Sequence, residues 1–144
     1  MFNYCPKCND DAIEFIDQQY FLCSKCHFIY YHNIASAVAA IIFCQGKILF
    51  TTRAKSPQIG FLDLPGGFVD PNESLEQALS REIQEELALE LSNWKYLCSQ
   101  PNIYLYKNIE TRTLDSIFVA ELESMPRCVL QTSEISDAFW LKPE

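Results

Sequence analysis

The sequence is poor in positive charge. Lys and Arg together number 11 of 144 residues against 19 Asp and Glu, which gives a net charge of −8. General nucleic-acid binders carry a basic face that neutralises phosphates. This balance therefore argues against nucleic acid as a partner, although a bound metal ion can still bring an anionic substrate to an acidic protein.

Signals for export and membrane insertion are also missing. The apolar run 34–43 is far shorter than the roughly 20 residues that span a bilayer, and residues 1–11 are polar, unlike a signal peptide. We therefore expect a cytoplasmic protein without a membrane segment. In a reducing compartment, the seven cysteines indicate metal binding or free thiols instead of a disulfide framework.

Four of these cysteines form two C-x-x-C pairs, Cys5–Cys8 and Cys23–Cys26, joined by a segment that can form a short hairpin. Four thiolates suit tetrahedral Zn²⁺, so residues 1–32 are predicted to be a zinc ribbon with Cys5, Cys8, Cys23 and Cys26 as ligands of one structural ion. A redox pair and free buried thiols are the alternatives. His27 and His32 are interpreted as packing or surface residues in preference to spare ligands.

Residues 33–144 are predicted to form a mixed α/β domain. Ser74 followed by Gln77 is a capping-box pattern that begins a helix over 74–88, a run without Gly or Pro. Strands are predicted at 35–43, 47–53, 96–100, 103–109, 113–120 and 138–141, with a short strand and a Pro-Gly turn at 64–68.

The predicted helix carries carboxylates on its apolar side. At 100° per residue, Glu82 and Glu86 fall within about 20° of Leu75, the centre of the apolar stripe, and Glu85 about 80° away. Arg81 is predicted on the solvent side. A solvated acidic face would lie opposite the stripe, so convergence of these three glutamates indicates a site for Mg²⁺, which prefers oxygen ligands.

The preceding loop contains Gly66 and Gly67, which allow close approach of a backbone to a phosphate or metal. Gly67, Glu73 and the run 81–89, read as Arg-Glu-Ile-Gln-Glu-Glu-Leu-Ala-Leu, closely resemble the Nudix box. One position departs, since the family usually has Gly where Ala88 stands. We expect the helix to run slightly longer there, with no effect on the charged positions.

This resemblance implies a Nudix-type α/β/α sandwich with a mixed sheet and a pyrophosphohydrolase activity on a nucleoside diphosphate derivative. It implies that Glu82, Glu85 and Glu86 bind Mg²⁺ or Mn²⁺, with Glu82 and Glu85 catalytic. Glu73, Arg81 and Gly67 would support these ligands, through an ion pair between Glu73 and Arg81 that fixes the loop on the helix.

The four-cysteine segment before the box, and Ser99-Gln100-Pro101 after it, resemble the branch of the family that contains NADH and ADP-ribose pyrophosphatases. The rest of that branch's motif is absent, because the chain continues Asn102-Ile103-Tyr104. ADP-ribose or NADH is the expected kind of substrate, and a homodimer is possible by resemblance. The alternatives are a ligand-sensing module without catalysis and a zinc-ribbon adaptor.

Two further groups of residues are candidates for the site. The resemblance implies a carboxylate in the loop before the last strand, where Glu134 in a flexible loop is preferred to Asp137 and to Asp115 as proton acceptor, the alternative being a solvated Glu134. Phe61, Tyr104 and Tyr106 can stack a base or nicotinamide, but half-buried strand residues are the preferred interpretation.

Overall fold

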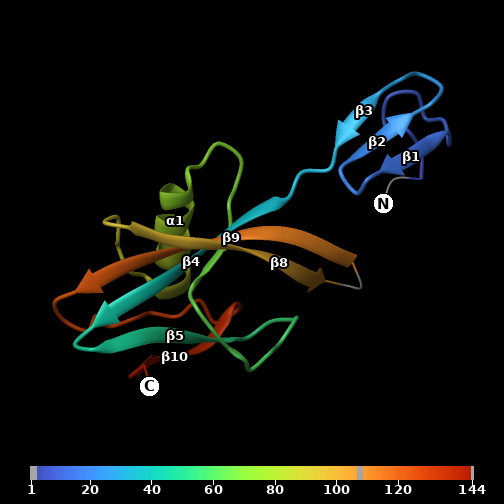
Figure 1. Cartoon of the computed structure of the whole chain (residues 1–144). Coiled ribbons are helices and arrows are strands. Elements are labelled where there is room, and N and C mark those ends of the chain that lie inside the picture. The colour runs from blue at the N-terminus through green and yellow to red at the C-terminus, as the bar shows by residue number, and fades with distance from the viewer. Residues whose placement is uncertain (1–2, 107–108, 144) are drawn as a thin grey trace. The chain divides into compact units, whose positions relative to one another are not determined.

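The computed structural model describes residues 3–106 and 109–143. The chain divides into two compact units, with the boundary between Ile34 and Ala35, near the predicted division at residue 32. Each unit has its own sheet and its own packed interior. Figure 1 shows the strands of both units and the helix of the second.

The first unit is a three-stranded antiparallel sheet of β1 (Ile13–Ile16), β2 (Tyr20–Cys23) and β3 (Ile29–Tyr31), in that order. The β1–β2 hairpin is the predicted connection between the two cysteine pairs. His32 packs edge-on against Phe15 and Phe21, as expected of a packing histidine.

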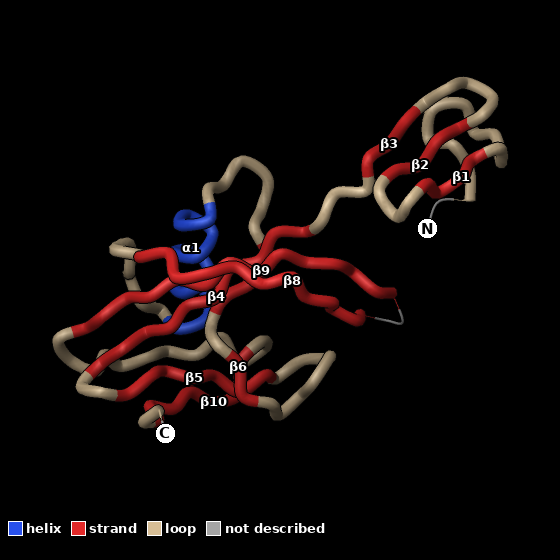
Figure 2. Tube along the Cα trace, in the orientation of Figure 1, coloured by secondary structure: helices blue, strands red, loops and turns tan. Residues whose placement is uncertain are grey.

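The second unit is built on a seven-stranded mixed sheet with the order β10-β5-β4-β9-β8, in which β6 also pairs with β5 and β7 with β4. Its strands are β4 (Ala35–Cys44), β5 (Lys47–Arg53), β6 (Leu62–Asp63), β7 (Gly66–Phe68), β8 (Lys95–Tyr106), β9 (Ile109–Leu122) and β10 (Ile135–Leu141). Among the described residues the unit has one helix, α1 (Leu75–Leu87), seen in Figure 2 against the strands. The predicted mixed sheet is confirmed, and the described residues form one of the helical layers of the expected sandwich.

The pairing partners of β4 change along its length, and this change divides the sheet into two branches. It runs parallel to β9 along its whole length, but it pairs with β5 only at Phe43 and Cys44. Beyond that point β5 leaves β4, and β7 takes its place beside residues 37–39. The two branches of the sheet therefore diverge towards the beginning of β4.

Helix α1 begins and is oriented as its sequence predicts. Ser74 is the N-cap, and both hydrogen bonds of the capping box with Gln77 are present. Leu79, Ile83 and Leu87 are fully buried and join a core that includes sheet residues of β4 and β9. Removing such side chains from water supplies about 1.5–3 kcal/mol each.

The expected extension of the helix past Ala88 is wrong. Ala88 is the C-cap, with a left-handed φ of 55°, and its N–H donates to the carbonyl of Gln84 while that of Leu89 donates to Ile83. This is the hydrogen-bond pattern that glycine normally provides at a helix end. Ala88 therefore ends the helix where the family's glycine would, at some conformational cost.

The strands predicted at 96–100 and 103–109 form one strand, β8, through Pro101; residues 107 and 108 lie outside the described part. Pro101 is accommodated because β8 is an edge strand, where a missing N–H breaks no second ladder. Across the described residues, none of the helical structure has the length and apolar character needed to cross a membrane.

Candidate active site and metal centres

The four cysteines of the first unit come together. Their sulfur atoms lie within 4.8 Å of one another, with 3.7 Å between Cys5 and Cys26 and between Cys8 and Cys23. A tetrahedron of thiolates around Zn²⁺, at about 2.3 Å from metal to sulfur, has edges of about 3.8 Å. The sulfur positions therefore fit one zinc ion and are too far apart for disulfides.

A salt bridge supports this cluster. The ammonium group of Lys25, inside the second cysteine pair, pairs with Asp10 just after the first pair. This hydrogen bond lowers the pKa of Asp10, and the pair links the two loops that carry the sulfurs.

In the second unit, Glu82, Glu85 and Glu86 of α1 differ in their exposure to solvent. Glu86 is buried at 7% exposure, the side chain of Glu82 is 14% exposed, and that of Glu85 is 51% exposed. This order follows the angles expected from the helical period. Glu82 and Glu86 share the interior side of α1, and Glu85 lies at its border with solvent.

Gly66 and Gly67 of β7 make room for these carboxylates. The N–H of Gly66 donates a 3.1 Å hydrogen bond to Oε2 of Glu86, and a Cβ on Gly66 would lie 2.1 Å from the carbonyl oxygen of Val38. A Cβ on Gly67 would lie 2.5 Å from the carboxyl carbon of Glu82. Any side chain at either position would displace a neighbour.

Arg81 ties the loop to the helix, and its placement on the solvent side was wrong. Its side chain is 26% exposed. The guanidinium lies 2.7 Å from Glu73, 2.9 Å from Glu82 and 3.4 Å from Glu85, and it donates to the carbonyl of Phe68 at 3.0 Å. The expected pairing of Glu73 with Arg81 is present. The hydrogen bonds from Arg81 lower the pKa of Glu73.

The buried glutamates carry an electrostatic cost. Burial raises the pKa of Glu86 to about 8, and the charges of Glu82, Glu134 and Asp63 add to the shift. Burial also raises the pKa of Glu82, against the opposing effect of Arg81. Crowded carboxylates that are reluctant to ionise are the groups that a divalent cation stabilises.

A cavity of about 410 Å³ lies beside Glu82, Glu85 and Glu86 of α1. This volume is typical of small-ligand sites. Of the site residues predicted from the sequence, it brings together Gly67, Glu82, Glu85, Glu86, Tyr104, Asp115 and Glu134. Tyr104 is half-buried and packs edge-on against Phe68 at 5.7 Å between ring centroids.

Glu134 is held firmly at the cavity. Its N–H donates to the carbonyl of Gln131, its carbonyl accepts from Ala54, and Gln131 in turn donates to the carbonyl of Glu86. The loop is thus a hydrogen-bonded turn anchored to α1 and to the end of β5, contrary to the flexible loop that its serines suggested. The side chain forms a 2.7 Å ion pair with Lys55.

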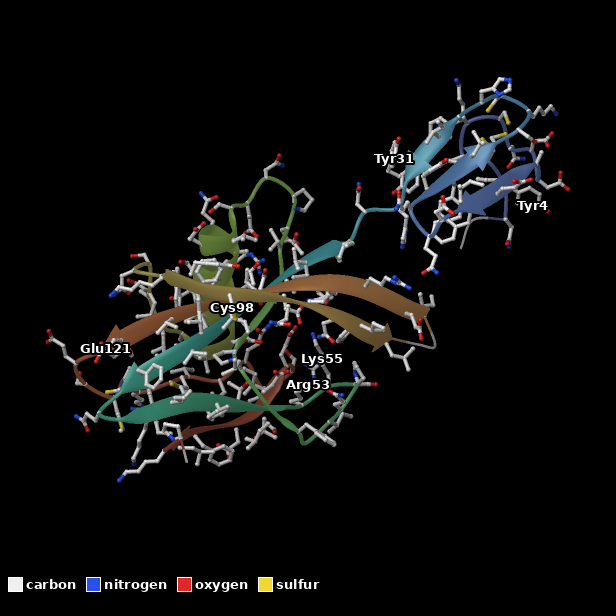
Figure 3. The ribbon with its side chains drawn as sticks, in the orientation of Figure 1. Tyr4, Tyr31, Arg53, Lys55, Cys98 and Glu121 are labelled. Carbon is white, nitrogen blue, oxygen red and sulfur yellow. The ribbon has the colours of Figure 1, made fainter. Side chains whose placement is uncertain are left out.

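Sequence reasoning missed two cations that line the same cavity as the glutamates, Arg53 and Lys55 (both labelled in Figure 3). Arg53 pairs with Asp63 at 2.9 Å, donates to the carbonyl of Pro57 at 2.9 Å, and lies 3.5 Å from the hydroxyl of Tyr104. The available signal was a basic pair directly after the second strand of the domain, in an otherwise acidic chain.

Two other predicted residues stand apart. Phe61 is 63% exposed in the loop before β6 and is not among the residues that line the cavity, so the structure does not bring it to the glutamates. Asp137 lies in a bulge of β10, bonded to the N–H of Ala138, and also does not line the cavity. The side chain of Tyr106 lies outside the described residues.

The family model of the NUDIX domain matches residues 33–144. The chain belongs to the Nudix family. The match includes the glycines of β7, the glutamates of α1 and the residues around the cavity.

Relatives extend this likeness beyond the Nudix domain. The NAD-capped RNA hydrolase NudC of Escherichia coli O1:K1 / APEC is 30% identical over 139 residues, 96% of this chain and 51% of that protein. The chain thus spans about half the length of the curated relatives it matches. The likeness covers nearly all of the chain and so includes cysteine-containing sequence ahead of the Nudix domain.

Solved structures agree with the fold. A MutT NUDIX hydrolase from Burkholderia pseudomallei has a TM-score of 0.67 at 27% identity, covering 76% of this chain and 84% of that one. The NUDIX domain of Shewanella oneidensis NrtR, solved with ADP ribose, has a TM-score of 0.65 at 26% identity, covering 78% and 75%.

Proposed function

We propose that this chain is a Mg²⁺- or Mn²⁺-dependent pyrophosphohydrolase that cleaves the diphosphate bond of a nucleoside diphosphate derivative. The observation that carries the proposal is the convergence of Glu82, Glu85 and Glu86 on a cavity that Arg53 and Lys55 also line. Carboxylates and cations in one cavity suit a substrate whose diphosphate bridges a metal and basic side chains.

Glu82, Glu85 and Glu86 are the proposed metal ligands. When bound, the divalent cation supplies charge neutralisation of the diphosphate and a more acidic water. Arg81 positions Glu82 through its bond to the carboxylate, and Gly67 leaves space for that carboxylate. Glu86 is fixed by the N–H of Gly66.

The remaining chemistry falls to residues outside the helix. Glu134 accepts the proton of the attacking water in this proposal, and its ion pair with Lys55 orients the carboxylate in the cavity. Arg53, oriented by Asp63 and by the carbonyl of Pro57, presents its remaining donor surface to phosphate oxygens.

ADP-ribose, or NADH, is the proposed kind of substrate. Two similarities support this choice: the NudC relative is named for an NAD-capped substrate, and the NrtR domain was solved with ADP ribose. NAD and ADP-ribose share an adenosine diphosphate joined to a second group, and the acidity of the chain favours a small molecule over a nucleic acid.

The proposal also includes a structural zinc ion and a homodimer. One structural Zn²⁺ is held by Cys5, Cys8, Cys23 and Cys26, and the cytoplasm keeps these thiols reduced. A homodimer is proposed by likeness to the family and is tested by light scattering of the purified chain.

The test is a Mg²⁺-dependent phosphate-release assay across ADP-ribose, NADH, dinucleoside polyphosphates, nucleotide sugars and nucleoside triphosphates. We expect the diphosphate-linked compounds to be cleaved, and Glu85→Gln to abolish cleavage while exposed Glu90→Gln does not. A ligand-sensing module or a zinc-ribbon adaptor would bind without releasing product. Faster cleavage of triphosphates than of every diphosphate-linked compound would contradict the substrate choice.

A further inference from the structure

Asp115 is a carboxylate of the cavity that belongs to neither the metal ligands nor the ion pairs. It lies on β9, where its Oδ2 accepts a 2.8 Å hydrogen bond from the amide of Asn102 and its Oδ1 a 2.7 Å bond from the hydroxyl of Thr113. Thr113 is buried at 3% exposure, and the Oδ1 of Asn102 accepts the N–H of Ile103. Both donors are thus held in place, and they fix the orientation of the carboxylate.

Asp115 shares with Glu86, a proposed metal ligand, the lack of an ion-pair partner among the described residues, whereas the other carboxylates of the cavity have one. Glu82 and Glu85 share Arg81, Asp63 pairs with Arg53, and Glu134 pairs with Lys55. Within residues 3–106 and 109–143, no Lys or Arg forms an ion pair with Asp115, whose partners are a neutral amide and a hydroxyl.

The free acceptor sites of the Asp115 carboxylate limit which ligand groups it can bind. A carboxylate has about four acceptor sites, and two of these are used by Asn102 and Thr113. Away from the proposed metal ligands, the others accept from a hydrogen-bond donor, and an anionic phosphate would be repelled. The group that faces Asp115 must therefore be an uncharged or cationic donor on a part of the ligand away from the diphosphate.

The sheet places Asp115 two strands away from β7, the strand whose Gly67 adjoins Glu82. Within the sheet, Ala37 of β4 pairs with Asp115 of β9 on one side and with Phe68 of β7 on the other. Two strand spacings, about 10 Å, thus separate Asp115 from β7, where Gly67 adjoins the carboxylate of Glu82. The small side chain of Ala37 lies between them and lines the same cavity.

We infer that Asp115, oriented by Asn102 and Thr113, is a specificity-determining residue that accepts a hydrogen bond from a hydroxyl or amine on the nucleoside part of the substrate. This inference rests on the proposed function. It deepens that proposal by assigning the recognition of the nucleoside to β8 and β9, away from the glutamates that bind the metal.

The experiment compares ADP-ribose with two analogues under saturating Mg²⁺. The inosine analogue lacks the base amine, and the 2′-deoxyadenosine analogue lacks one ribose hydroxyl. The wild-type chain is expected to prefer ADP-ribose over one analogue by at least tenfold in kcat/KM, and that analogue identifies the donor. In Asp115→Asn, KM for ADP-ribose should rise at least tenfold, kcat should change little, and the preference should fall towards unity.

Two variants serve as comparisons. Glu121→Gln removes a charge from the exposed end of the same strand (Figure 3) and should retain wild-type selectivity. Asn102→Ala alters an exposed side chain and should lose part of the selectivity, because Asp115 then lacks one of its two orienting donors. Tryptophan fluorescence from Trp94 and Trp140 verifies folding in each case.

The outcomes separate this inference from the proposed function. Cleavage of ADP-ribose by Asp115→Asn with wild-type KM and selectivity would overturn the inference alone. An equal loss of kcat on all three compounds, with a changed Mg²⁺ requirement, would also overturn it by assigning Asp115 to the metal site. If the wild-type chain cleaves none of them, equilibrium binding of the same three compounds gives the same comparison, and equal affinities would overturn the inference.

Discussion

The N–H of Gly66 lies 3.1 Å from Oε2 of Glu86 and donates the hydrogen bond that holds this buried carboxylate. The bond joins β7 to the last turn of α1 and fixes the side chain of Glu86 beside the cavity. It favours the charged form of Glu86, but burial and the neighbouring carboxylates outweigh it, and the pKa is raised to about 8.

This balance predicts how stability depends on pH in the presence of a chelator. The folded state holds the Glu86 proton more tightly than the unfolded state, whose pKa is near 4.5, so this group's contribution falls as pH rises from about 4.5 to about 8. Below that window both states are protonated and the group contributes nothing. Glu86→Gln removes the penalty and should unfold at higher temperature than wild type at pH 9.

The measurement is thermal unfolding followed by the fluorescence of Trp94 and Trp140, both in the Nudix unit. One pKa unit corresponds to about 1.4 kcal/mol, so a shift of several degrees is expected at pH 9 and almost none at pH 4. Mg²⁺ should stabilise the wild type more than Glu86→Gln. Exposed Glu90→Gln is the control, and a lower unfolding temperature for Glu86→Gln at pH 9 would contradict the assignment.

A second prediction concerns the contact between Gly67 and Glu82. Gly67→Ala places a methyl group 2.5 Å from the carboxylate. The carboxylate is the movable end of a side chain, so we expect the domain to fold with little loss of stability and Mg²⁺ to bind about tenfold more weakly, near 1.4 kcal/mol.

Titration of activity against Mg²⁺ measures this effect. Gly46→Ala is the informative comparison, because its Cβ would meet open space while its φ of +73° strains the backbone. That variant should lose stability and keep its metal affinity. Equal metal affinity in Gly67→Ala and wild type would show that Glu82 does not bind the ion from this position.

Much of this site could be predicted because it is local in sequence. The helical period placed Glu82 and Glu86 on the buried side of α1, and the capping box fixed where the helix begins. The cysteine spacing likewise anticipated four neighbouring sulfurs. In each case the geometry depends on a few consecutive residues, whose arrangement follows from standard backbone conformations.

Long-range contacts could not be predicted in this way. The helical period predicts a solvent-facing Arg81, because it takes no account of residues outside the helix. In the structure the guanidinium of Arg81 contacts the carboxylate of Glu73 and the carbonyl of Phe68. The pairing of Asp115 with Asn102 depends on the register of β8 and β9. Ala88 also ends the helix without the expected glycine, since the hydrogen bonds of the cap outweigh the cost of its φ.

The third prediction concerns zinc. Cys8→Ser removes one of four sulfurs, and we expect the purified variant to lose bound zinc, because structural sites require all four ligands. Metal analysis should find about one zinc per wild-type chain. Cys98→Ser changes a thiol outside the cluster and should retain the full zinc content. Zinc-free wild-type protein with four reactive thiols would exclude the site.

The last prediction separates the roles of Glu134 and Glu85. Glu134 lines the same cavity as the helix glutamates, and its only ion pair in the described chain is with Lys55, at 2.7 Å. If Glu134 is the proton acceptor, Glu134→Gln should lower kcat at least tenfold with little change in KM or in the Mg²⁺ requirement. Glu85→Gln should instead weaken the response to Mg²⁺ as well as turnover.

Lys55→Met tests the same assignment from the other partner. Without the ammonium group, the carboxylate of Glu134 loses the partner that orients it in the cavity, so kcat should fall. In the Glu134→Gln background, Lys55→Met should cause little further loss of kcat, because the oriented carboxylate is already gone. Unchanged kcat in Glu134→Gln would remove this residue from proton transfer and leave Lys55 and Glu134 as a structural pair that anchors the loop to β5.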